Sequence, residues 1–279
     1  MKIDTRLLTS LLRRTQRTQC VAGKPQPQVT ACMLEVEGDR VTTTSIVRDG
    51  KTSLSVFKAP AETTHENTTE SLPVPDIDRV LGVLSSHSSP LHLSFDAGAN
   101  RLIFKSGKKT TRLIASLNGL AFPHSSETLT AWGSKSKELS GNFLFDAGNF
   151  VGYRMRSGET RQPLYLLKVD ANEMFEALRC DNMNGQKLNR YTFATMSGVV
   201  RVGVGEEMKG LTFTDFDNYE ESRDVQFEWS FEGGLENVLA GVSGDITFYF
   251  LDFRNEAQGM RMVIDLGERG FVYQAGVLV

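Results

Sequence analysis

Along this chain, segments with the hydrophobic spacing of a helix are followed by segments with the alternation of strands. In the stretch 75–115, apolar residues first follow the helical spacing i, i+3, i+4, i+7 and then alternate with polar residues. Alternation begins at Leu91 and continues through 102–104 and 111–115, with turn residues between these segments. The pattern predicts one short helix followed by three antiparallel strands. The helical positions are Ile77, Val80, Leu81 and Leu84.

The same order of elements occurs again near the C-terminus. A second helical stripe is followed by strand-like segments at 246–250, 262–264 and 271–275. Amphipathic helices before hairpins are common, but the match of four apolar positions and of the downstream order favours two copies of one domain. The stripe consists of Leu235, Val238, Leu239 and Val242.

A further helix is predicted from Arg6 to Thr18. We expect its buried stripe to be Leu7, Leu8, Leu11 and Leu12. A second face of this helix is basic and contains no carboxylate. A solvated surface explains such a face as well as a ligand-binding surface does. Its cations are Arg6, Arg13, Arg14 and Arg17.

The second half has a counterpart to this helix. Asp170 and Glu173 form a capping-box-like start, and Arg179 is expected to be exposed near the end of the helix. Lys187 and Arg190 follow closely. The remaining strands are expected at 30–37, 40–48, 52–58, 164–169, 191–196, 199–204, 211–214 and 226–231. The fold class is therefore α+β, with two tandem domains that each combine antiparallel sheets with two helices.

The domain boundary is predicted where the periodic pattern dissolves. We expect a first domain at 1–118, a connector at 119–141 and a second domain at 142–279, in which 142–161 is interpreted as an insertion. Isolated apolar residues in the connector region either pack on their own domain or form a docking surface, and both interpretations fit. These residues include Leu117, Leu120, Phe122 and Leu129.

Composition limits the class of protein. The chain has 279 residues, 40% hydrophobic residues and a formal net charge of −3, as in a soluble globular protein. No apolar run reaches the ~20 residues of a membrane span, so we expect no membrane partner. The three cysteines lack metal-ligand spacing, which favours an intracellular, reducing compartment. The acidic net charge excludes a protein that coats nucleic acid with its whole surface, but allows a local basic stripe.

The sequence contains no recognisable catalytic or metal-binding motif. Its four histidines lack metal-ligand spacing, and there is no phosphate-binding Gly-rich loop and no nucleophile elbow. We therefore expect a protein that is not an enzyme and needs no cofactor. The remaining candidates are cations on helices or close to them, which contact phosphates without reading sequence. They are Arg6, Arg13, Arg14, Arg17, Arg79, Arg179, Lys187 and Arg190.

Several segments resemble DNA polymerase sliding clamps of the type of proliferating cell nuclear antigen and the T-even phage clamp. They are PDIDRVLGVL, LIFKSGKKTTRLIA, ITFYF and MRMVIDLGERGFVYQAGVLV. The resemblance implies two domains per subunit, sheets in an outer wall, helices lining a hole, and three subunits in a ring around double-stranded DNA. It also implies a non-catalytic processivity factor, an acidic exterior, and DNA polymerase and a clamp loader as partners.

The resemblance implies a role for individual residues of this chain. Arg13 and Arg14 match the basic pair of the family's first helix, Arg79 a basic position of the second, and Arg179 the arginine of the third. The connector and the C-terminal residues border the family's pocket for partner peptides. The implied pocket residues are Leu117, Leu120, Phe122, Leu129, Val277 and Leu278.

Two departures from the family are visible. The fourth helix, 233–243, contains Glu236 and no Lys or Arg, and the connector region is longer and less hydrophobic than usual. A diverged phage or viral clamp fits both departures. We expect such a protein in the cytoplasm of a bacterial host, or in the nucleus if it is eukaryotic. One alternative is a monomeric or dimeric clamp-fold factor that holds DNA on one basic face. Another is a structural protein of duplicated β-domains without a DNA role.

Overall fold

Two units of similar construction make up the chain. The structure is a computed structural model that describes residues 1–21, 24–27, 29–46, 53–62, 70–115, 126–179, 190–196, 198–204, 213–217, 226–232, 234–253 and 259–276. The first unit consists of Met1–Gln16, Val29–Arg48 and Ser55–Ser140. The second consists of Arg17–Gln28, Asp49–Leu54 and Gly141–Val279. Each unit is described by itself.

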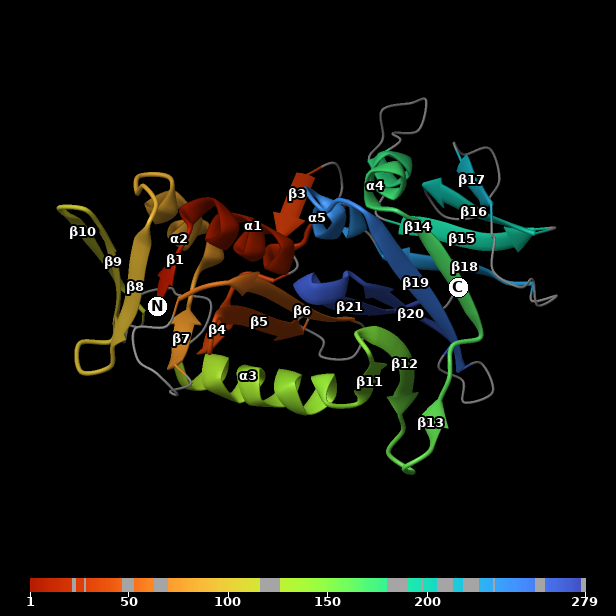
Figure 1. Cartoon of the computed structure of the whole chain (residues 1–279), viewed down its shortest axis with the longest axis horizontal. Coiled ribbons are helices and arrows are strands. Elements are labelled where there is room, and N and C mark those ends of the chain that lie inside the picture. Colours follow the sequence, from red (N-terminus) through yellow and green to blue (C-terminus); the bar gives the residue numbers. More distant parts are fainter. Residues whose placement is uncertain are drawn as a thin grey trace. The chain divides into compact units, whose positions relative to one another are not determined.

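The first unit contains three helices and two sets of antiparallel strands among the residues described. In chain order its elements are β1 (Lys2–Ile3), α1 (Thr5–Gln16), β4 (Cys32–Glu37), β5 (Arg40–Ile46), β6 (Ser53–Pro60), β7 (Glu70–Val74), α2 (Ile77–Leu84), β8 (Leu91–Asp96), β9 (Arg101–Ser106), β10 (Lys109–Ile114) and α3 (Ser126–Ser140). Figure 1 shows these elements in chain-order colours.

The second unit begins with a hairpin and repeats the same kinds of element. Its elements are β2 (Thr18–Val21), β3 (Lys24–Pro27), β11 (Phe143–Asp146), β12 (Asn149–Arg154), β13 (Thr160–Arg161), β14 (Tyr165–Asp170), α4 (Ala171–Arg179), β15 (Arg190–Met196), β16 (Val199–Val204), β17 (Phe213–Asp217), β18 (Glu228–Glu232), α5 (Leu235–Leu239), β19 (Asp245–Phe253), β20 (Gly259–Asp265), the short 3-10 helix η2 (Gly267–Arg269) and β21 (Gly270–Ala275).

The strand order confirms the internal repeat. In the first unit, one set of strands runs in the order β1-β8-β9-β10; in the second, the corresponding set runs β14-β19-β20-β21. The strands that follow the first helix of each unit are ordered β6-β5-β4-β7 and β17-β16-β15-β18. Both units therefore place their strands in the same order, and each has one helix before and one between the two sets (Figure 1).

The predicted alternation separates the two faces of the sheet β1-β8-β9-β10. Leu91, Leu93, Leu102 and Phe104 are buried, whereas His92 and Lys105 between them are exposed. The strands pair antiparallel, with Leu93 opposite Phe104. The helix α2 buries Ile77, Val80 and Leu84, as its spacing predicts. The buried face of this sheet is thus part of the hydrophobic core of the first unit.

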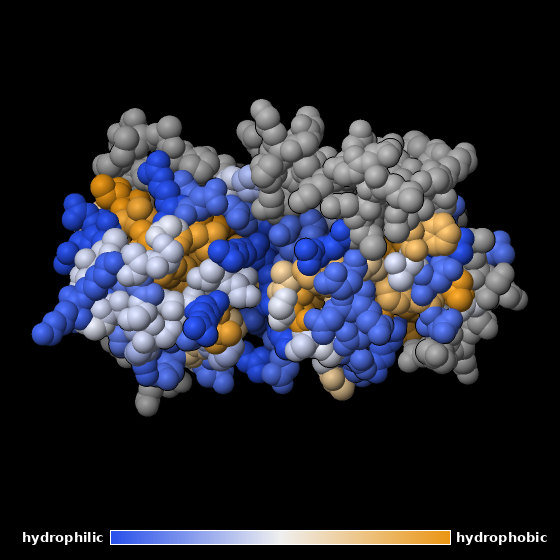
Figure 2. All heavy atoms as spheres, turned by 90° about the horizontal axis from the view of Figure 1, so that it is seen from above, coloured by the Kyte–Doolittle hydropathy of each residue, from blue (hydrophilic) through white to orange (hydrophobic). Residues whose placement is uncertain are grey.

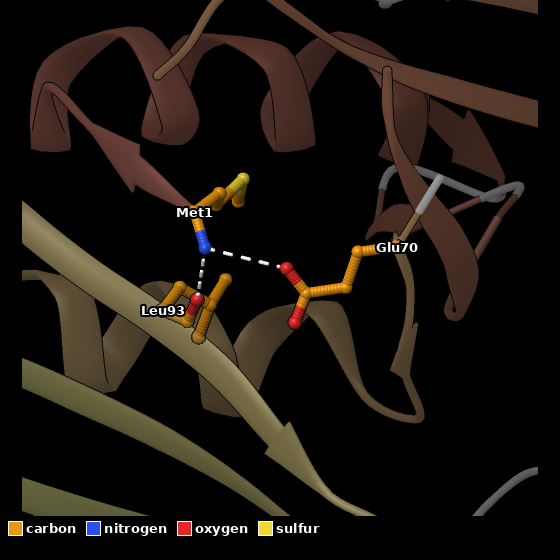
Figure 3. A network of polar contacts seen from close by, with 3 residues as sticks. All are labelled: Met1, Glu70 and Leu93. Carbon is orange, nitrogen blue, oxygen red and sulfur yellow. Dashed lines mark hydrogen bonds and ion pairs between the residues drawn. The ribbon is translucent and has the colours of Figure 1, made fainter. Parts of the chain in front are cut away.

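The N-terminal residue is held inside the first unit. The Met1 amine donates to the Leu93 carbonyl at 2.7 Å and forms an ion pair of 3.4 Å with the Glu70 carboxylate (Figure 3). The Met1 side chain is buried. These contacts join β1 to β8 and to the start of β7, which places the beginning of α1.

Helix α3 lies where the sequence pattern predicts a connector and no helix. It packs on β4, β5 and β7 of its own unit (Figure 1). Lys137 forms an ion pair of 2.7 Å with Glu35 on β4, and Ser136 is fully buried. A Cβ atom at Gly133 would lie only 3.1 Å from Met33 Cγ. The sheet side of this helix therefore includes small and polar residues, so no apolar stripe marks it in the sequence.

Residues 142–161, interpreted as an insertion, form the three-stranded sheet β11-β12-β13. Aromatic rings hold it to the second unit: Phe143 lies 5.0 Å from Phe271 and 5.0 Å from Tyr273 between ring centroids. The Asp265 carboxylate accepts the amide of Phe150 at 3.2 Å, and burial raises the pKa of Asp265. The segment is therefore a packed element of the second unit.

Within the ranges given above, no helix is long and apolar enough to cross a bilayer. The same part of the chain contains no group of three or more His, Cys, Asp or Glu residues placed to hold a metal ion.

Candidate nucleic-acid interface

Helix α1 presents two of the predicted cations to solvent. Its first turn is capped by Asp4, whose Oδ1 accepts the amides of Arg6 and Leu7 at 2.7 and 3.1 Å. The hydroxyl of Ser89 donates to the other carboxylate oxygen at 2.7 Å. This hydrogen bond is the main reason that the pKa of Asp4 is lowered. Arg6 and Arg13 are exposed on the helix.

The expected buried stripe of α1 is wrong at one position. Leu8, Leu11 and Leu12 are buried, but Leu7 is 40% exposed. Figure 2 looks onto the side of the molecule where α1 lies in Figure 1, and it shows hydrophobic patches between hydrophilic side chains. The exposed surface of α1 is therefore mixed apolar and basic.

Two other cations of the predicted basic face are buried. Arg14 is 9% exposed, because it follows Leu11 by three positions and lies at the edge of the buried stripe. Arg17 is 1% exposed. Its backbone has a φ of 46° just after the helix ends, so its side chain leaves the helical face. Its guanidinium donates to the hydroxyl of Ser53 and to Gln274 Oε1, the latter at 2.8 Å. The expectation of exposure is wrong for both arginines.

Helix α2 carries its cation in an ion pair. Asp76 caps the helix by accepting the amide of Arg79 at 3.0 Å, and the same carboxylate lies 3.1 Å from Arg79 Nε. Asp78 is exposed and accepts a hydrogen bond from Gln16 Nε2 of α1 at 2.7 Å. Two carboxylates thus accompany the one cation of α2, although Arg79 is exposed as predicted.

Helix α4 has a similar balance. Asp170 caps it, accepting the amides of Asn172 and Glu173 at 2.9 and 3.2 Å, as the sequence predicts. Arg179 is exposed, lies 3.6 Å from the Glu176 carboxylate, and has its guanidinium 5.1 Å from the ring centroid of Phe175. Lys187 lies outside the part of the chain that is described. Arg190 begins β15, and its side chain is also outside that part.

The acidic residue of the fourth helix has a local structural role. Glu236 on α5 accepts a hydrogen bond from the hydroxyl of Tyr191 on β15. Tyr191 is 3% exposed. Burial, followed by the nearby Glu236 charge, raises the pKa of Tyr191 well above its usual range. Glu236 thus accepts a hydrogen bond from a buried hydroxyl, on the helix where the family resemblance implies a cation.

Solved structures with a similar arrangement of elements include DNA sliding clamps. The DNA polymerase sliding clamp from Bacillus subtilis superimposes with a TM-score of 0.62 and 14% identity, over 100% of this chain and 64% of that chain. The DNA polymerase III beta subunit from Thermotoga maritima gives 0.60 and 12%, with the same coverage. The C. crescentus beta sliding clamp gives 0.59 and 13%, over 100% of this chain and 66% of that chain.

This chain has the sliding-clamp fold. It spans about two thirds of the length of the bacterial clamps it matches. No family model matches the sequence, and no curated protein matches it. The clamp fold is confirmed, while the narrower type of proliferating cell nuclear antigen and a phage or viral origin stay predictions.

The predicted peptide pocket of the clamp fold falls mainly outside the described residues. This applies to Leu117, Leu120, Phe122, Val277 and Leu278, and also to the side chain of Leu129 on α3. The pocket, like the connector role of 119–141, therefore stays a prediction.

One group of exposed cations was not singled out from the sequence. Arg101, Lys105 and Arg112 lie on the solvent face of β9 and β10. The alternation that predicts these strands also assigns them to one face, and that signal could have identified the group. It was missed because the search for basic residues followed helices.

Proposed function

We propose that this chain is a sliding clamp, a non-catalytic protein that encircles duplex DNA and tethers a replicative polymerase. The main support is the clamp fold over the whole chain, at a TM-score of 0.62. The repeated strand order of the two units adds to it, since a ring needs similar units with similar helices. The proposal includes a clamp loader as partner, and the cytoplasm or nucleus as its place.

We infer a ring of three copies. β10 and β17 each end a set of strands in the described structure. Ring closure would pair such edges, which otherwise invite uncontrolled association.

The DNA contact of such a ring is expected to be weak and independent of sequence. On the helices, Arg6 and Arg13 are exposed, and the nearby carboxylates of Asp76 and Glu176 reduce the contribution of Arg79 and Arg179. Interchangeable phosphate contacts allow sliding. A ring held on DNA by its topology needs no strong attraction, so this sparse charge is compatible with the proposed function.

Partner peptides are proposed to bind the pocket that the family resemblance implies. The apolar side chains of this pocket come from the connector region, which includes the start of α3, and from the C-terminal residues. They are Leu117, Leu120, Phe122, Leu129, Val277 and Leu278. Aromatic and aliphatic anchors of a partner peptide would insert there. This is the surface through which the clamp would hold its polymerase.

The small number of exposed helix cations also fits a second architecture. This is a monomeric or dimeric clamp-fold protein that holds DNA on one face. Light scattering during size-exclusion chromatography separates the two. We expect a mass of three 31.0 kDa chains, unchanged on dilution through the micromolar range. A stable mass of one or two chains would contradict the three-copy ring. Failure of the protein to bind or retain any DNA would favour the structural protein of duplicated β-domains.

A further inference from the structure

We propose that the exposed face of the sheet β1-β8-β9-β10 binds the phosphate backbone of nucleic acid. The binding residues are Arg101, Lys105 and Arg112. This surface, here called the basic sheet face, is distinct from the helices α1 and α2 of the same unit. The proposal does not depend on ring formation, because it concerns one sheet of the first unit.

The strand register brings the three cations together. Arg101 and Lys105 are four residues apart on β9 and point to the same side. Arg112 on β10 lies opposite Ile103, halfway between them. Arg112 is therefore the diagonal neighbour of both cations, at a typical backbone separation of about 7–8 Å. All three side chains are exposed.

The charges of this face are not balanced by ion pairs with the described residues. Arg101, Lys105 and Arg112 make no ion pair with any residue the structure describes. By contrast, Lys2 at the edge of the same face pairs with Glu62 at 2.6 Å. Three neighbouring like charges repel one another. A bound polyanion would offset that repulsion.

Besides Glu62, which pairs with Lys2, one carboxylate is found on the described part of this face. Asp96 lies opposite Arg101 in the register, but its Oδ1 accepts the amide of Ala99 at 3.0 Å, within the turn that follows β8. Lys108, in the turn between β9 and β10, is exposed and adds a further cation at the end of the face. His92, opposite Lys105, is exposed on the same face. The face is thus strongly cationic.

The chemistry of the face favours nucleic acid over a protein partner. Protein interfaces of good affinity have an apolar centre. Here the apolar side chains that share the face are Ile103 and Ile114, both half-buried. Phosphate contacts need cations and no apolar centre, and they release counterions from the polyanion. The cationic face with few apolar side chains therefore matches a phosphate backbone.

A second copy of the chain is the main competing occupant. Its β17 exposes Asp215 and Asp217 at a sheet edge. Asp215, however, already receives two hydrogen bonds from Arg201 of its own sheet, at 2.7 and 2.8 Å, and Arg201 lowers the pKa of that carboxyl. The two carboxylates of β17 are therefore too few to neutralise the three cations of the basic sheet face. A nucleic acid has a phosphate at every nucleotide.

The test compares two triple variants that remove the same charge. One carries Arg101→Ala, Lys105→Ala and Arg112→Ala. The control carries Lys135→Ala, Arg154→Ala and Arg156→Ala, all exposed outside the basic sheet face. Fluorescence anisotropy measures binding of a linear duplex of about 25 base pairs across about 50–200 mM salt. Should the alanine variant fail to fold, Lys105→Gln with Arg112→Gln keeps the aliphatic stems and replaces it.

We expect the first triple variant to bind about tenfold more weakly at the lowest salt. Its slope of log affinity against log salt should be shallower by about two to three, because each lost phosphate contact removes about 0.9. The control should bind like the wild type. Equal losses in both triple variants, or no measurable binding by the wild type, would overturn the proposal. Unchanged DNA binding with a lower mass in light scattering would assign the face to a second copy instead.

Discussion

At the scale of single residues, the cations singled out from the sequence have different roles in the structure. Arg6 and Arg13 are exposed, Arg79 is held by its own helix cap, and Arg17 is a buried donor to Ser53 and Gln274. The residue type alone did not reveal this. Helical spacing places a residue on a face only while the helix lasts, and α1 ends at Gln16, one residue before Arg17.

The contact between Tyr191 and Glu236 gives a prediction at this scale. Tyr191→Phe leaves the carboxylate without its donor, and the free energy of unfolding should fall by about 1–2 kcal/mol. Because the pKa of Tyr191 is raised in the folded state, the folded state favours the protonated phenol. The stabilisation is therefore present below about pH 10 and is lost as the pH rises above that value.

Urea unfolding at pH 7.5 measures this effect. The matched control is Tyr153→Phe, since the hydroxyl of Tyr153 makes no hydrogen bond with the described residues and its ring stacks on Tyr273. If both variants lose the same stability, the Tyr191–Glu236 contact has no special role. The acidic character of α5 would then remain unexplained.

At the scale of elements, periodic segments were predictable and aperiodic ones were not. The helix α2 and the strands β8 to β10 follow directly from alternation at 77–114. Helix α3 was missed because it packs with Gly133 and Ser136 in place of an apolar stripe. The strand β7 is not among the strands expected from the sequence; it contains Pro73 and lies at the end of its set of strands.

The sheet β11-β12-β13 gives a prediction at the element scale. Phe143→Ala removes a ring that is 6% exposed and touches four other aromatic rings. It should lower the free energy of unfolding by about 3–4 kcal/mol. Phe145→Ala on the same strand should cost less than half as much, because Phe145 is already 39% exposed. Thermal or urea unfolding of the two variants makes the comparison.

Hydrogen exchange adds a local readout to that comparison. In Phe143→Ala, the amides of β11 and β12 should exchange faster, while those of β15 and β16 should keep their protection. Uniform acceleration throughout the second unit would mean that 142–161 belongs to its central folding core. It would then not be an added element held by aromatic contacts.

At the scale of the whole molecule, the sequence was sufficient for the repeat and for the clamp fold, because both rest on the order of periodic segments. Charge distribution was harder to predict. The family resemblance implies basic helices and an acidic exterior, but α4 carries Glu173 and Glu176 beside Arg179, and an exposed sheet carries unpaired cations. Which cations are exposed depends on caps, ion pairs and helix ends, and these become visible only when the chain is folded.

Retention on circular and linear DNA is the most direct test of the central claim that this chain encircles a duplex. The protein, loaded with its clamp loader or by spontaneous opening, is passed with nicked circular plasmid through a gel-filtration column at about 200 mM salt, where simple phosphate contacts are weak. We predict that it elutes with the circle and is lost when a single restriction cut provides free ends. Equal retention on circular and linear DNA, or equal loss from both, would contradict encirclement.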